Sequence, residues 1–290
     1  MRILTKPRHL PGLLSAGALV MGFALTAQPA LAAGIADTKH NLGSSNGKNI
    51  NYVSGPNPAG LSLNGEICVF CHTPHGSDTS AAAPLWNKQL PSGTNYKTYA
   101  SLQSGTMDGV VGKPGAISLA CLSCHDGAQA MDNIINAPGS GNYDPTGGGA
   151  GGRGYQWTGA NQTAGKLNSN TVAMLGTDLS NDHPIGVEYC GGPVGGNIGT
   201  CRDADFVLPT AGTGGNMAAG PWWVDTSDGT SGSRQKTDMI LYAAKSDRTD
   251  GIGPQVECAS CHDPHSTNGL FMRRAGGNTN SVTCLSCHVK

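Results

Sequence analysis

Cysteine and histidine are the residues whose spacing in this sequence could do chemistry. Eight of the ten cysteines fall in four sets, in which two residues separate the cysteines and a histidine follows directly. In chain order, the first to fourth sets are Cys68, Cys71 and His72; Cys121, Cys124 and His125; Cys258, Cys261 and His262; Cys284, Cys287 and His288. Residues i, i+3 and i+4 share one face of a helical turn, so each set presents two thiols and an imidazole together.

This arrangement is the attachment signature of c-type haem. The two thiols can bond the porphyrin edge while the histidine lies beneath the iron. Four sets therefore predict four haem c groups, attached covalently through thioether bonds. Two alternatives use the same cysteines, a pair of structural zinc sites or disulfides among the sets. Neither alternative explains why a histidine follows every second cysteine.

The other histidines match the predicted haems in number. Of nine histidines, four belong to the sets and His9 lies in the N-terminal leader described below. The four that remain, here called the spare histidines, are His40, His75, His183 and His265. Four irons need four sixth ligands, so the count predicts histidine on both faces of every iron and no open coordination position. Methionine is the alternative axial ligand, but no methionine lies in a motif context.

Two spare histidines lie three residues after a set, in CVFCHTPH at 68–75 and CASCHDPH at 258–265. Neither can reach the far face of its own haem, so each must ligate another. Because side chains three apart start about 5–6 Å from each other, the two irons held there are expected about 10 Å apart. We assign His75 to the haem of the second set and His265 to the haem of the fourth. His183 and His40 then serve the remaining two.

The two cysteines outside the sets, Cys190 and Cys201, lie eleven positions apart. We predict a disulfide between them, which stabilises the fold by about 3 kcal/mol on the loop-entropy model. The alternative is two free thiols. Because His183 lies shortly before Cys190, the bridge is expected to hold a ligand-bearing loop.

The chain begins with a leader typical of secretion. Residues 1–32 combine a basic start, an apolar run and the small-x-small pattern Ala30-Leu31-Ala32. The alternative is an uncleaved membrane anchor. Removing the leader changes the balance from 18 basic against 19 acidic side chains to 15 against 19, a net charge of −4. The sequence contains no dense basic patch of the kind that nucleic-acid binding requires. No later segment is long and apolar enough to span a membrane.

Composition predicts the fold class. Glycine supplies 44 of 290 residues, aromatic residues 5% and charged residues only 13%. Few large apolar side chains are available for a core, so the haems must supply one. We expect mostly irregular coil with a few short helices, wrapped around a stacked chain of four covalently bound haems, and little β structure.

The four sets occur as two pairs, which predicts a doubled two-haem module. One module covers about 64–136 and the other about 254–290. A glycine-rich coil over about 137–253 separates them and contains GGGAGGRG at 147–154 and GGPVGGNIG at 191–199. We expect ordered coil rather than a flexible linker there, because His183 must be delivered from it. Residues 33–290 then form a single tetrahaem domain.

Local patterns predict few regular elements. The attachment turns should be helical, and the helix of the second set should continue to Asn136. Residues 236–246, KTDMILYAAKS, are the other helix candidate. Pro74 and Pro264 are expected to end helices just after the attached histidine. Short strands are expected around 204–208 or 221–225.

The motifs together resemble the multihaem c-type cytochromes with doubled CXXCH motifs. The order CxxCHTPHG, PLWN at 84–87, CLSCHDG, DHPIGV at 182–187, ECASCHDPH and a final CLSCH is similar to that of tetrahaem extracellular cytochromes of the OmcE kind. Subunits of that kind polymerise into electron-conducting filaments. The resemblance implies electron transfer rather than enzymatic catalysis, low reduction potentials, and location outside the cell or on its surface. It also implies that His40 ligates a haem of an adjoining copy.

Three functions follow from these observations. The first is the subunit of a conducting filament, with copies of itself as partners. The second is a discrete exported, periplasmic carrier, which keeps His40 within one chain and exchanges electrons with redox proteins or extracellular acceptors. The third is a haem reductase, which would need an open iron position that the histidine count does not leave. His40 also has a plainer interpretation as a surface histidine.

Overall fold

The computed structural model describes residues 34–42, 52–54, 67–131, 134–136, 156–195, 197, 199–211, 222–226, 232–242 and 254–289. All of them lie in the unit that spans 32–290. The predicted leader at 1–32 falls outside the described residues, as does the glycine-rich stretch 147–154. Across the described ranges, no helix has both the length and the apolar character needed to cross a membrane.

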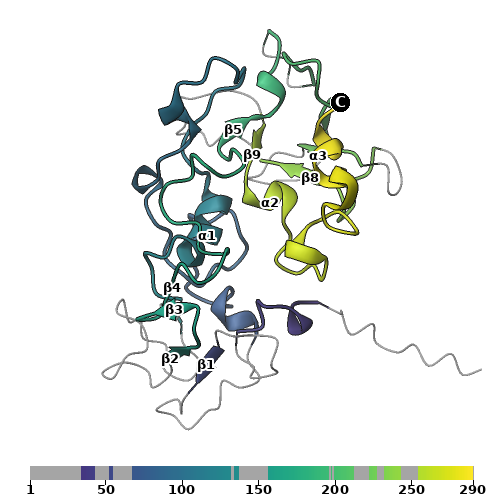
Figure 1. Cartoon of the computed structure of the whole chain (residues 1–290). Helices are drawn as coiled ribbons and strands as arrows, with labels where there is room; N and C mark the ends of the chain where they lie inside the picture. The colour runs from purple at the N-terminus through teal and green to yellow at the C-terminus, as the bar shows by residue number, and fades with distance from the viewer. Residues whose placement is uncertain are drawn as a thin grey trace, which may run out of the picture. The chain divides into compact units, whose positions relative to one another are not determined.

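Short helices mark the cysteine-histidine sets, as predicted (Figure 1). The α-helices are α1 (Ala116–His125), α2 (Cys258–Cys261) and α3 (Val282–Cys287). Short 3-10 helices cover Ile35–Asp37, Cys68–Phe70, Gly93–Asn95, Tyr99–Leu102, Tyr189–Gly191, Gly269–Phe271 and Thr279–Ser281. The rest of the described chain is largely coil and turn, as the composition predicts.

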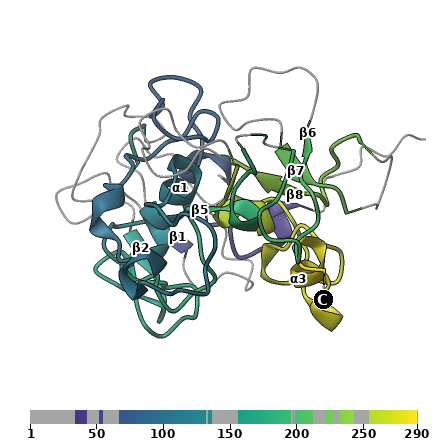
Figure 2. The same cartoon turned by 90° about the horizontal axis from the view of Figure 1, so that it is seen from above.

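The strands are short and form small antiparallel sheets. They are β1 (Tyr52–Ser54), β2 (Gln156–Thr158), β3 (Gln162–Thr163), β4 (Lys166–Leu167), β5 (Val187–Glu188), β6 (Thr210–Ala211), β7 (Trp222–Val224), β8 (Met239–Leu241) and β9 (Gln255–Val256). β1 pairs with β2, β3 with β4, and β5 with β9. The remaining sheet has the order β6-β7-β8, which Figure 2 shows as one small layer.

The apolar core is divided into small clusters that adjoin the cysteines of the sets. One cluster centres on Phe70, Met131 and Ile134 and packs against Cys124. A second is built from Tyr189, Cys190, Val224, Met239 and Leu241 and packs against Cys261 and Cys287. A third contains Tyr96, Leu122 and Leu179. Small clusters beside attachment sites agree with the expectation that few apolar side chains are available for a core.

The helix of the second set is shorter than predicted, because α1 ends at His125 rather than at Asn136. The buried Asp126 side chain accepts hydrogen bonds from the backbone N–H groups of Ala128 and Gln129, a local turn that competes with the helix. Gly127 follows with φ +66°, a left-handed conformation that favours glycine. The Leu175 N–H donates a hydrogen bond to the His125 carbonyl. The apolar run after His125 therefore packs as coil.

The helix predicted over 236–246 is also wrong where the structure describes it. Residues Met239–Leu241 form β8, which pairs with β7. Met239 and Leu241 are buried and Ile240 is only partly so, the alternation of a strand. The buried Asp238 side chain accepts from the Thr226 and Gln235 N–H groups, which holds the start of β8. Pairing with β7 overrides the local helical pattern.

The other local predictions have mixed outcomes. A strand predicted near 221–225 is confirmed by β7, whereas 204–208 holds only an isolated bridge between Phe206 and His288. The helices of the first and third sets end at Phe70 and Cys261, before Pro74 and Pro264 are reached.

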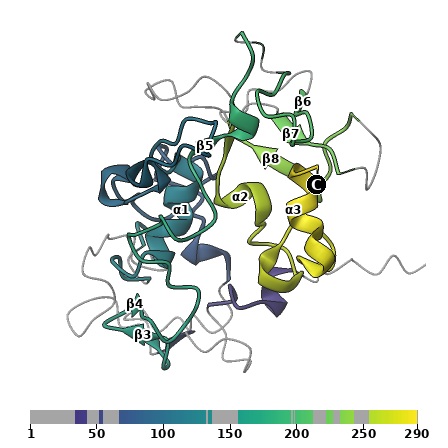
Figure 3. The same cartoon turned by 45° about the horizontal axis from the view of Figure 1, so that its top comes forward.

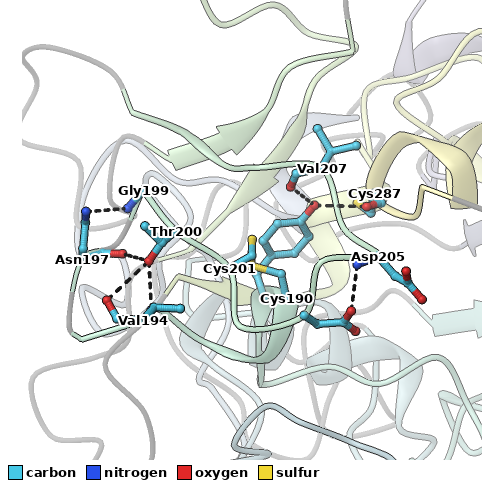
Figure 4. Close-up of a disulfide and its surroundings, with 11 residues drawn as sticks. Cys190, Val194, Asn197, Gly199, Thr200, Cys201, Asp205, Val207 and Cys287 are labelled. Atoms are coloured by element: carbon cyan, nitrogen blue, oxygen red, sulfur yellow. Dashed lines mark hydrogen bonds between the residues drawn. A yellow bond between two sulfur atoms is a disulfide. The ribbon is translucent and has the colours of Figure 1, made fainter.

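The predicted disulfide between Cys190 and Cys201 is confirmed (Figure 4). It closes a loop in which the Thr200 hydroxyl donates to the Asn197 carbonyl and the Val194 N–H donates to the Thr200 hydroxyl. Beside the bridge, the Tyr189 hydroxyl donates to the Val207 carbonyl at 2.8 Å. The bridge thus stabilises a loop that packs near the fourth set.

Candidate haem-binding site

Each set keeps its thiols and imidazole on one turn even where the helix has ended. His72, His262 and His288 each donate their backbone N–H to the carbonyl of the first cysteine of their set, at 2.7, 3.1 and 2.9 Å. His262 and His288 already have extended backbone angles at these positions. The bond from i+4 to i is what the haem-attachment geometry requires, and it survives in short turns.

Three of the four attached histidines have their Nδ1 atoms occupied. His72 donates from Nδ1 to the Pro84 carbonyl, His125 to that of Ala173, and His262 to that of Leu270, each at 2.7 Å. A carbonyl oxygen can only accept, so Nδ1 carries the hydrogen and Nε2 carries the lone pair. This is how a metal-ligating histidine is oriented by its surroundings.

In three spare histidines, too, Nδ1 is the ring nitrogen that lies against an oxygen atom. Nδ1 of His40 lies 3.4 Å from the Pro264 carbonyl, and that of His183 lies 3.1 Å from the Pro184 carbonyl. Nδ1 of His265 lies 3.3 Å from the Asp263 carboxylate, a contact that raises the pKa of His265. In each case Nε2 is left as the atom available to a metal ion.

Two spare histidines face attached ones across the fold. The ring centroids of His72 and His265 are 6.2 Å apart and nearly parallel, and those of His40 and His125 are 6.1 Å apart. A bond from a histidine nitrogen to a metal ion is about 2 Å long, so imidazoles on opposite sides of one metal have centroids about 6 Å apart. Each separation is of the size that two imidazoles holding one iron between them would need.

These pairs differ from the ones assigned from sequence. The His265 ring lies near that of His72 in the first set, whereas the sequence assigned His265 to the haem of the fourth; the His40 ring lies near that of His125 in the second set, to whose haem the sequence assigned His75. Among the described residues, His75 and His183 make no ring contact with another aromatic or imidazole ring. Spacing excludes the haem that a spare histidine cannot reach, but only the tertiary fold decides which other haem is close.

His40 is partly buried against residues of its own chain. Its ring stacks on Phe271 with centroids 4.1 Å apart. Burial, and next the neighbouring His125, lower the pKa of His40 to about 4. A neutral imidazole is the form that binds a metal ion, so this setting suits a ligand better than a surface histidine.

The thiols of successive sets are neighbours. Burial and then the Cys124 thiol raise the pKa of Cys71 to about 12. A hydrogen bond to the Cys258 thiol raises the pKa of Cys121 and lowers that of Cys258. Burial raises the pKa of Cys287 to about 12, with Cys261 the next cause. The cysteines of the sets are free thiols, and their contacts run from the first set to the fourth.

An orphaned donor beside the first set also fits a haem. The indole ring of Trp86 lies 6.3 Å from that of His72 in an edge-on arrangement, and its buried Nε1 has no hydrogen-bond partner. A haem carries propionate groups that accept hydrogen bonds, so a bound haem offers the missing acceptor. Two thiols, an oriented imidazole and an unpaired donor together match the chemistry of haem c. Sequence reasoning noted PLWN at 84–87 only as part of a resemblance and missed the role of Pro84 and Trp86.

Comparison with known proteins agrees with this site. A family model described as the doubled CXXCH motif matches residues 254–290, which hold the third and fourth sets. The match supports a multihaem c-type cytochrome with covalently bound haem c, and hence electron transfer rather than enzymatic catalysis. No curated protein and no solved structure matches the chain.

Proposed function

We propose that this chain carries electrons through four haem c groups, each held between two histidines. The observation that carries the proposal is the spacing of the two imidazole pairs, at 6.1 and 6.2 Å, with free Nε2 atoms on oriented rings. The haem supplies one-electron iron chemistry, while the protein sets ligation, spacing and exposure. Histidine on both faces leaves no open position, so the chain relays electrons and transforms no substrate.

The ligand pairs follow from the contacts. The first haem takes His72 and His265, and the second takes His125 and His40. His75 and His183 are then the ligands left for the haems of His262 and His288. This arrangement links the N-terminal and C-terminal modules, because residues from 258–265 complete a haem attached at Cys68 and Cys71.

Haem content and spin state test the proposal. Protein expressed with haem-attachment machinery should contain four haem c groups per chain by the pyridine haemochrome assay, all low-spin in the ferric visible spectrum. Substituting His40→Ala should leave four haems and convert one to the high-spin form. Fewer than four haems, or a high-spin signal in the unaltered protein, would contradict the proposal.

A discrete exported carrier is the form that the His40 contacts favour. His40 stacks on Phe271 and lies against the Pro264 carbonyl of the same chain. We therefore propose that the second haem is completed within one chain, and that the protein exchanges electrons with redox proteins or extracellular acceptors. The family resemblance supports the other form, a filament subunit in which His40 ligates a neighbouring copy. A filament of this chain would then need other contacts between copies.

Microscopy of the haem-loaded protein separates the two forms. A discrete carrier should elute as a monomer and show no filaments by negative stain, with or without His40. If His40 joins subunits, the unaltered protein should form filaments and the His40→Ala variant should be monomeric. That second result would overturn ligation within one chain.

A further inference from the structure

Glu257 is a buried carboxylate at the meeting point of two haem-attachment helices. It directly precedes Cys258 and is 2% exposed. Figures 1 and 3 show α1, which carries the second set, beside α2, which carries the third. The inference below rests on the proposed function, because it concerns how two of the four haems are held.

On one side the carboxylate caps α1. The Gly115 N–H, just before the first residue of α1, lies 3.0 and 3.1 Å from the two carboxylate oxygens. The fully buried Ser118 hydroxyl donates to the same carboxylate. A negative group at this end is favoured by the helix dipole and by unsatisfied N–H groups.

On the other side the same residue caps α2. The Glu257 N–H donates to the Ser260 hydroxyl at 2.9 Å, and the Ser260 N–H donates to the Glu257 backbone carbonyl at 2.8 Å, so the two residues cap the start of α2 reciprocally. The Ser118 hydroxyl also accepts from the Cys258 N–H at 2.9 Å. The network therefore runs from the backbone of one attachment helix to the backbone of the other.

The attachment points themselves meet here. Cys121 on α1 and Cys258 on α2 are neighbours where the two helices meet, so an attachment sulfur of the second haem lies beside one of the third. A capping residue for α2 alone would need only the Ser260 contact. Glu257 instead joins both helices, its carboxylate contacting the start of α1 and its backbone contacting Ser260 of α2, at the position where one haem of each module is attached.

A second buried glutamate shows what an ordinary role looks like. Glu188 is 6% exposed, and its carboxylate accepts from the Val110 N–H at 3.2 Å. That contact ties β5 to a loop and involves no residue of a haem-attachment helix. Burial of a carboxylate alone does not therefore create a link between attachment helices.

We propose that Glu257 is the positioning residue for the electron-transfer step between the two modules. It fastens α1 to α2, fixes the haem of the second set relative to the haem of the third, and places a negative charge beside both. A fixed negative charge favours the oxidised form of a nearby iron, so Glu257 holds the reduction potentials of these two haems down.

Two variants test this from opposite sides. Glu257→Gln keeps the shape and removes the charge. Gly115→Ala keeps the glutamate and its charge but puts a methyl group 2.5 Å from the Oε1 atom, so the carboxylate must shift away from the start of α1; the backbone φ of −71° is one that alanine adopts freely. Gly105→Ala is the matched control, because its added methyl meets no atom within 4 Å. Each is made in the haem-loaded protein and followed by spectropotentiometric titration and by haem counting.

The expected result is selective. Glu257→Gln should raise two of the four midpoint potentials by about 59 mV and leave the other two unchanged. A shift of that size, about 59 mV, corresponds to a tenfold change in the one-electron equilibrium constant. Gly115→Ala should move the same two, and Gly105→Ala none. A uniform shift of all four potentials, or no shift in either variant while four haems are retained, would overturn the role of Glu257. If Glu257→Gln does not assemble, the Gly115→Ala result decides alone. Fewer than four haems in the unaltered protein would instead overturn the proposed function.

Discussion

The two near-identical stretches CVFCHTPH and CASCHDPH form different local structures from the same ligand residues. The first begins in a 3-10 turn at Cys68–Phe70, and the residue before it, Ile67, offers no side-chain cap. The second begins in α2, where Glu257 and Ser260 form a capping box. The motif fixes which residues attach a haem, whereas the residue before it decides how firmly the turn is anchored.

The position after the attached histidine makes a second difference. In the first stretch the Thr73 hydroxyl donates to the His75 carbonyl at 3.0 Å, a backbone contact. In the second, Asp263 accepts from the His265 backbone N–H and lies 3.3 Å from its Nδ1. A carboxylate behind a ligating imidazole orients it and increases its basicity. The two copies should therefore hold haems of different potential.

Removing the spare histidines one at a time gives the largest expected effect. In His265→Ala the first haem should lose its sixth ligand, so one haem in four should become high-spin by visible and EPR spectroscopy. His75→Ala is the matched variant in the other copy and should open a different haem.

The haem that responds can be identified by deletion. When Cys68 and Cys71 are both alanine, the first haem cannot attach, and His265→Ala should then add no high-spin signal. An added signal in that background would return His265 to the fourth set, as the sequence alone suggested.

Local features of this fold were predictable, and features that depend on distant contacts were not. The attachment turns follow from the i, i+3, i+4 geometry, and the bridge between Cys190 and Cys201 follows from two cysteines left over in the count. The run after His125 looked helical, yet Asp126 and Gly127 form a turn that ends α1. Residues 239–241 looked helical, yet β7 makes them a strand.

The histidine count shows the same division. Arithmetic from the sequence predicts that the spare histidines are ligands but does not locate their irons. The rings of His72 and His265 lie close together although the residues are almost two hundred positions apart, and nothing in the spacing of either stretch encodes that proximity. Glu257 was missed because a lone glutamate before a cysteine gives no signal until Gly115 is seen beside it.

The disulfide is a feature of the C-terminal region and gives the next largest effect. The hydroxyl of its neighbour Tyr189 donates to the Val207 carbonyl and lies 3.4 Å from the Cys287 carbonyl. Replacing Cys190 and Cys201 with serine should lower the free energy of unfolding by about 3 kcal/mol, or about 6–12 °C in melting temperature. Calorimetry of the haem-loaded protein measures this. An unchanged melting temperature would mean that the loop needs no bridge once haem is bound.

Exchanging the residue behind the spare histidine gives the smallest effect and the sharpest comparison. Asp263→Asn removes the carboxylate from His265 and should raise one midpoint potential, by about 59 mV if the one-electron equilibrium constant changes tenfold. Thr73→Asp should place a carboxylate behind His75 and lower a different potential. Each copy would then take on the electrostatics of the other.

The pH dependence separates this effect from a change in folding. The hydrogen bond from His265 is the largest cause that lowers the pKa of Asp263 to about 2, below its ordinary 3.8. The Asp263 carboxylate is therefore fully ionised in the folded protein above pH 3.8. The stabilisation that it provides by being ionised is lost only as the pH falls through about 2. Between pH 5 and 8, the difference in potential between Asp263→Asn and the unaltered protein should be constant. A difference that varies across this range would show that another ionising group, and not Asp263, sets the potential of that haem.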